Sequence, residues 1–114
     1  MRVTVLGAGA FGLALASIFK ENNNDVTVWS RFEEEVASLR EKNTNEKIKN
    51  VKLPNGINYS TNLEEAVQKS ELLVIAIPDQ FVDNLVKQVK PLVKKQYILI
   101  ASKGIENDTF SFLE

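Results

Sequence analysis

Glycines at fixed offsets, in the run Gly7-Ala8-Gly9-Ala10-Phe11-Gly12, constrain this chain more than any other feature. The run directly follows a β-branched segment, Val3 to Leu6, and opens a stretch of small and helix-forming residues from Ala10 to Phe19. In that context a Gly-x-Gly-x-x-Gly pattern indicates a dinucleotide-binding turn. The first glycine permits the bend, the second lets the backbone approach a diphosphate, and the third allows close helix packing. The alternative is a glycine-rich turn that binds nothing.

Strand and helix patterns alternate along the rest of the chain. Apolar or β-branched runs are separated by amphipathic runs and fall at residues 26–29, 57–60, 72–77 and 97–101. The run from Leu72 to Ile77 is continuously apolar, as in a strand buried on both faces of a parallel sheet. The alternation predicts an α/β fold of the Rossmann type, a doubly wound parallel sheet with right-handed crossovers and helices on both faces. Residues 43–58 are polar and predict a long loop.

Apolar spacing predicts which side of each helix is buried. In the first helix the predicted face comprises Phe11, Ala14, Leu15, Ile18 and Phe19. In the second, Phe32 joins Val36 and Leu39 at helical spacing. Asn62 is a predicted N-cap. Phe81 begins the apolar stripe of the helix after Pro78, so it either packs in the core or leans over a bound nucleotide.

Composition excludes several classes of chemistry. The chain has no cysteine, which excludes disulfides and thiolate catalysis, and no histidine, so proton transfer near neutral pH falls to lysine, a carboxylate or a residue outside the chain. No spacing of carboxylates indicates a metal site. The net charge of −1 argues against binding to nucleic acid.

The apolar run from Val3 to Phe19 is too short and too rich in glycine to predict a membrane span. Its resemblance to a signal peptide is explained better by the glycine motif. We therefore expect a cytoplasmic protein without membrane partners.

The end of the second strand bears on the choice of cofactor. NAD-binding turns usually place Asp or Glu about twenty residues after the motif, where it accepts from the ribose 2′-hydroxyl. This chain has Ser30 and Arg31 there, and a guanidinium pairs with the 2′-phosphate of NADPH. Arg31 therefore favours NADPH modestly over NADH. The alternative is that Arg31 is an ordinary surface residue and one of Glu33 to Glu35 reaches the ribose.

Ligands of a doubly wound sheet bind beyond the carboxyl ends of its strands. The glycine turn, Arg31, the segment Pro78 to Phe81 and the segment Ser102-Lys103-Gly104 all follow strands, so we expect them to converge. Lys103 is a candidate for contact with an anionic substrate or for polarising a carbonyl, against the alternative of a solvated loop lysine.

The combination of these motifs resembles the amino-terminal domain of bacterial NAD(P)-dependent glycerol-3-phosphate dehydrogenases. The resemblance covers the whole chain and rests on five segments: residues 7–16, 28–31, 53–54, 77–81 and 101–106. It implies reduction of dihydroxyacetone phosphate to sn-glycerol 3-phosphate with NADPH or NADH, for glycerophospholipid synthesis.

Site residues also follow from the resemblance. Ala10 and Phe11 match a cofactor-contacting pair, Arg31 an adenosine contact and Phe81 an aromatic near the nicotinamide. Lys103 matches a lysine that touches both cofactor and substrate. Ala10 departs from the Ser, Thr or Asn usual at its position, so only its backbone N–H is expected to contribute.

Length is the main departure, because members of the family are about three times longer, beyond the usual size of one domain. The resemblance places the helical substrate domain, and the lysine proposed as general acid and base, beyond Glu114. Residues 1–114 are therefore expected to be an incomplete Rossmann domain without a catalytic residue and inactive alone. The edge of the fifth strand should then lack its normal neighbour and favour pairing with another chain. A homodimer is the alternative assembly.

Two other functions fit the same residues. One is a stand-alone dinucleotide-binding regulatory module, which does not need Lys103 beside a nicotinamide. The other is a dehydrogenase that acts on a different phosphorylated or acidic substrate.

Overall fold

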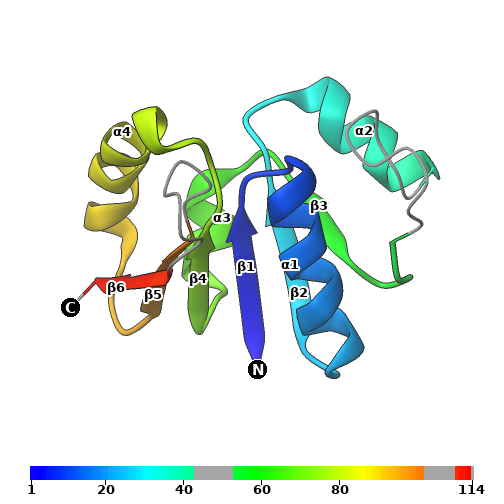
Figure 1. The fold of residues 1–114 in the computed structure, drawn as a ribbon, viewed down its shortest axis with the longest axis horizontal. Coiled ribbons are helices and arrows are strands. Elements are labelled where there is room, and N and C mark those ends of the chain that lie inside the picture. Colours follow the sequence, from blue (N-terminus) through cyan, green and yellow to red (C-terminus); the bar gives the residue numbers. More distant parts are fainter. Residues whose placement is uncertain (43–52, 102–109, 114) are drawn as a thin grey trace.

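A computed structural model describes residues 1–42, 53–101 and 110–113. It is an α/β fold in which a sheet of strand order β3-β2-β1-β4-β5-β6 is covered by helices (Figure 1). The elements in chain order are β1 (Arg2–Leu6), α1 (Ala10–Glu21), β2 (Asp25–Trp29), α2 (Glu33–Lys42), β3 (Asn58–Ser60), α3 (Leu63–Gln68), β4 (Leu72–Ile75), α4 (Asp79–Val89), the 3-10 helix η2 (Lys90–Leu92), β5 (Tyr97–Ala101) and β6 (Phe110–Leu113). The predicted doubly wound Rossmann-type sheet is confirmed.

The register of the parallel strands brings their carboxyl ends together. β1 pairs with β2 on one side and β4 on the other, so Leu6 lies opposite both Trp29 and Ile75. The chain winds outward from β1 through β2 to β3 and then returns to place β4 beside β1. This reversal is the switch point at which open α/β sheets bind ligands.

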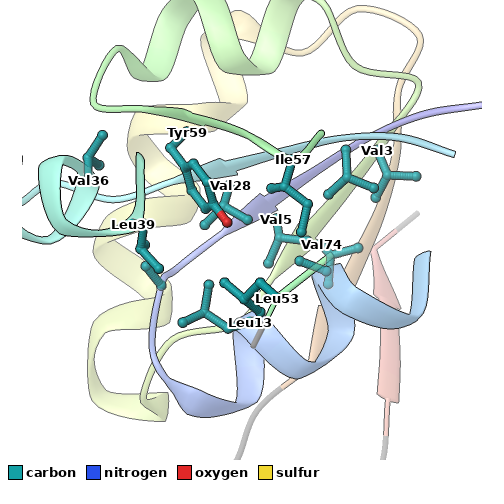
Figure 2. Close-up of a cluster of buried hydrophobic side chains, with 14 of the residues drawn as sticks. Val3, Val5, Leu13, Val28, Val36, Leu39, Leu53, Ile57, Tyr59 and Val74 are labelled. Atoms are coloured by element: carbon teal, nitrogen blue, oxygen red, sulfur yellow. The ribbon is translucent and has the colours of Figure 1, made fainter. Parts of the chain in front are cut away.

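Each face of the sheet has its own hydrophobic core. On the α1 and α2 side, valines of β1, β2 and β4 form one cluster with Leu13 of α1 and with Val36 and Leu39 of α2, and Figure 2 labels members of this cluster. On the other side, Leu73 and Ile75 of β4 pack with α3 and α4. β-branched residues dominate the strands because they suit a pleated surface that is covered on both sides.

The predicted buried face of α1 is wrong in part. The buried residues are Gly12, Leu13 and Ala16; Phe11, Leu15 and Phe19 are only partly buried. Ala14 is exposed and Ile18 is 55% exposed. The rotation of α1 is fixed by the contact of Gly12 with the Gly7 backbone, which apolar spacing does not reveal.

The prediction that Phe32 lies on the buried face of the second helix is also wrong. α2 begins at Glu33, and Phe32 is 58% exposed while Val36 and Leu39 are buried as predicted. Conversely, Leu53 of the predicted polar loop belongs to the core. Ile57, where that loop overlaps the strand predicted at residues 57–60, belongs to the core as well. The rest of that loop, residues 43–52, lies outside the described residues.

The predicted cap of α3 is confirmed. The Asn62 side chain accepts a hydrogen bond from the backbone N–H of Glu65 at 3.0 Å. Ala66 and Val67 of the same helix are buried beneath it. None of the helices in the described parts of the chain is long and apolar enough to cross a membrane.

The expectation of an unpaired edge beside β5 is wrong. β6 pairs antiparallel with β5, from Ile98 opposite Leu113 to Ala101 opposite Phe110. The short apolar segment at residues 110–113 occupies that edge because its backbone completes the hydrogen-bond ladder of β5. Pairing with another chain through the β5 edge is therefore not supported.

Candidate functional site

Loops that follow β1, β2 and β4 enclose a cleft of about 340 Å³ at the carboxyl edge of the sheet. Its walls come from the glycine turn, the segment after β2, the start of α2 and the start of α4. The lining residues are Gly7, Ala8, Gly9, Trp29, Ser30, Arg31, Phe32, Glu35, Ala76, Ile77, Pro78, Phe81 and Leu85. The predicted convergence is confirmed for these three loops.

Two glycines of the motif are required by close backbone approach. Gly7 has φ +130°, and a Cβ there would lie 2.3 Å from the carbonyl oxygen of Ala76. A Cβ on Gly12 would lie 2.3 Å from the carbonyl oxygen of Gly7. The turn therefore packs against both the end of β4 and the first turn of α1, and neither contact tolerates a side chain.

Gly9 differs from the other two, because a Cβ added to it would meet no heavy atom of the described residues within 4 Å. Its backbone, with φ −74° and ψ 176°, is available to any residue, so the fold itself does not require glycine at this position. The space in front of Gly9 is part of the cleft. A group as large as a diphosphate fits there only while no side chain fills it, and this is the arrangement that a dinucleotide needs.

The start of α1 suits an anion. Gly9 is its N-cap and makes no side-chain capping hydrogen bond, and the first turn holds no acidic residue. The first N–H groups of a helix have no partner within the helix, and the helix dipole places partial positive charge at this end. The cleft therefore offers an electropositive backbone surface beside Gly9.

Charged and polar groups gather at the end of the cleft that follows β2. The guanidinium of Arg31 lies 5.9 Å from the centre of the Phe32 ring, and both side chains are exposed. Ser30 is buried, and its hydroxyl donates to Glu35 Oε1 at 2.7 Å and accepts from the backbone N–H of Phe32 at 3.1 Å. Of the predicted alternatives for a ribose contact, Glu35 lines the cleft, whereas Glu33 and Glu34 do not.

Phe81 lies on the opposite wall of the cleft. It is 45% exposed, whereas Leu85, one turn later on α4, is 5% exposed. This position favours the prediction that its ring faces a ligand over the prediction that it packs in the core.

Trp29 was not singled out by its sequence pattern. It ends β2, is 8% exposed and lines the cleft, and its indole Nε1 has no hydrogen-bond partner among the residues that the structure describes. A buried donor without an acceptor costs about 1–3 kcal/mol. As the only tryptophan of the sequence, it also places a single fluorophore in the cleft wall.

Other predicted residues lie beside the cleft or outside the described structure. Ala10 and Phe11 form the first turn of α1 but are not among the cleft-lining residues, and Phe11 packs against the core. Lys103 lies in residues 102–109, outside the described residues.

The strand order, the glycine turn and the cleft together define a dinucleotide-binding domain of the Rossmann class. Residues 2–114 match the family described as NAD-dependent glycerol-3-phosphate dehydrogenase N-terminus. The chain belongs to this family.

Relatives and solved structures agree with that assignment. The chain is 37% identical to the glycerol-3-phosphate dehydrogenase [NAD(P)+] of Agathobacter rectalis over 95% of its own length and 33% of that protein's. It is 34% identical to the Bacillus subtilis enzyme of the same name, over 95% and 32%.

Among solved structures, the glycerol-3-phosphate dehydrogenase of Saccharomyces cerevisiae superposes with a TM-score of 0.78 at 25% identity, over 93% of this chain and 34% of that one. The Coxiella burnetii enzyme gives a TM-score of 0.83 at 24% identity over 91% and 33%, a likeness of fold. The chain thus spans about a third of the length of the relatives it matches.

Proposed function

We propose that this chain binds NADPH or NADH as the cofactor-binding part of an enzyme that reduces dihydroxyacetone phosphate to sn-glycerol 3-phosphate, for glycerophospholipid synthesis in the cytoplasm. The observation that carries the cofactor assignment is the space that the described residues leave in front of Gly9, at the start of α1 and in the lining of the cleft. The reaction is supported by the family and by the names of the relatives.

Each wall of the cleft has a role in this proposal. The backbone at Gly9 and at the start of α1 holds the diphosphate through N–H groups. We also assign cofactor contact to Ala10 and Phe11, which follow Gly9 in the first turn of α1 but do not line the cleft. Gly7 and Gly12 keep the turn tight enough for that approach. Arg31 contacts the adenosine end, and Phe81 covers the dinucleotide from α4.

The bound cofactor supplies the hydride, and the chain's own residues orient it. The glycine turn and the start of α4 exclude water from the side of the dinucleotide that they cover, which strengthens the electrostatic contacts made there. We assign Lys103 to contact with the cofactor and with the carbonyl or phosphate of the substrate.

Titration of the purified chain with NADPH, NADH and ADP-ribose, followed by the fluorescence of Trp29, tests cofactor binding. The informative variant is Gly9→Asp, because Asp is a preferred N-cap and has room, but its carboxylate would face the diphosphate. We expect it to fold as the unsubstituted chain does and to bind NADPH at least about a hundredfold more weakly, from lost space and charge repulsion together.

Asn62→Asp is the matched control, since it adds the same charge at the N-cap of α3, away from the cleft lining. It should leave the dissociation constants unchanged. Unaltered NADPH binding by a folded Gly9→Asp chain would contradict the proposed site. Equal affinity for ADP-ribose and NADH, with no effect of a Lys103 substitution, would favour a regulatory module over a dehydrogenase.

A further inference from the structure

The structure places a carboxylate and a guanidinium at the same end of the cleft. Arg31 follows β2 directly, and Glu35 reaches the cleft from the first turn of α2. In dinucleotide-binding turns, an acidic residue at the end of the second strand accepts from the ribose 2′-hydroxyl, and a basic residue pairs with a 2′-phosphate. This chain has both charges among the residues that line the cleft.

Ser30 brings the Glu35 carboxylate to the end of β2. Its backbone N–H donates to the Ser60 carbonyl at 3.0 Å, which fixes it to the end of β3, and its side chain is buried. From that fixed position the hydroxyl donates to Glu35 Oε1 at 2.7 Å. The Glu35 carboxylate is therefore held beside Ser30, the residue that directly follows β2.

We propose that Glu35, positioned by Ser30, limits the preference of this site for a 2′-phosphorylated dinucleotide. The inference rests on the proposed cofactor site and adds the residue that balances Arg31 there. A carboxylate has acceptor capacity for several hydrogen bonds, so the bond from Ser30 is compatible with another from a ribose hydroxyl. The same charge repels a 2′-phosphate, whereas Arg31 attracts it.

Glu35 differs in position, and not in charge, from the two glutamates that precede it. α2 begins with Glu33, Glu34 and Glu35, so all three are close in sequence to the residues after β2 that line the cleft. Glu33 and Glu34 are exposed and do not line it. Glu34 therefore provides a control with the same charge on the same helical turn.

The experiment measures dissociation constants of the 114-residue chain for NADH, NADPH, ADP-ribose and 2′-phospho-ADP-ribose. Glu35→Gln keeps the size of the side chain and an oxygen to accept from Ser30 but removes the charge. We expect the ratio of NADH to NADPH dissociation constants to rise about tenfold in favour of NADPH, as removal of one close like charge predicts. The two ADP-ribose probes should show the same change, because the nicotinamide is not involved.

Glu34→Gln is expected to leave the ratio within about twofold, because a solvent-exposed charge outside the cleft is screened. Ser30→Ala keeps the Glu35 charge but removes the hydroxyl that donates to it. This variant should shift the ratio in the same direction as Glu35→Gln by a smaller factor, and Ser30→Thr, which keeps a hydroxyl, should restore the ratio. A thermal melt of each variant shows whether a change reflects folding.

The outcomes separate the two proposals. If the unsubstituted chain binds none of the nucleotides, the proposed function itself fails. If it binds them and Glu35→Gln leaves the ratio unchanged, or shifts it no more than Glu34→Gln does, the role of Glu35 is overturned while the cofactor site stands.

Discussion

At the scale of single residues, the motif glycines have separable tasks, and matched substitutions distinguish them. Gly9→Ser is expected to fold with unchanged or slightly higher stability, because Ser is a better N-cap than Gly and meets no neighbouring atom. Gly12→Ser would place its Cβ 2.3 Å from the Gly7 carbonyl oxygen and should lower the free energy of unfolding by about 1–3 kcal/mol or more, as overpacking does. Urea denaturation of the two variants measures this difference. Equal stabilities would show that the tight packing of the turn is not a constraint.

The same scale shows what the sequence predicts about the site and what it does not. Gly7, Gly9, Arg31 and Phe81 were predicted from their positions after strands, and the structure places them around one cleft. The choice of Glu35 among three adjacent glutamates depends on the Ser30 hydroxyl, and the unpaired Trp29 Nε1 depends on what surrounds it in three dimensions. Local patterns carry neither kind of information, although a polar residue directly after a strand was a signal for Ser30.

At the scale of elements, α3 is short and depends on its cap. It spans Leu63–Gln68, and Asn62 satisfies the Glu65 N–H that the first turn would otherwise leave unpaired. Asn62→Ala should therefore lower the free energy of unfolding by about 1 kcal/mol, measured by urea denaturation. Thr61→Ala, at an exposed neighbouring position, is the control and should change it little. A loss of the same size in both variants would contradict a capping role for Asn62.

Element type was predictable because strands covered on both faces and amphipathic helices leave clear periodicities. The orientation of each element was less predictable from the sequence. The rotation of α1 follows from the Gly12 contact with Gly7, and Leu53 and Ile57 are buried in a segment whose composition is polar. β5 and β6 run antiparallel and pair through backbone hydrogen bonds. The pattern of side chains in the sequence does not identify which strand pairs with β5.

At the scale of the whole molecule, the core on the α1 and α2 side gives the fold a specific sensitivity to alkaline pH. Tyr59 of β3 packs there beside residues of α2 and the segment before β3, as Figure 2 shows, and is 6% exposed. Burial raises the pKa of its phenol from 10.0 to about 12. The unfolded chain ionises this group first, so its contribution to stability is intact below pH 10 and declines as pH rises toward 12.

Urea midpoints measured at pH 9, 10 and 11 test this dependence. Tyr59→Phe cannot ionise, so its midpoint should decline less steeply with pH than that of the unsubstituted chain, whatever the substitution costs at pH 9. Tyr97→Phe is the matched control, because Tyr97 is 73% exposed and its removal should preserve the original slope. All other groups are the same in the three chains, so only the difference between slopes is informative. Parallel slopes for Tyr59→Phe and the unsubstituted chain would mean that this phenol is not held neutral by the core.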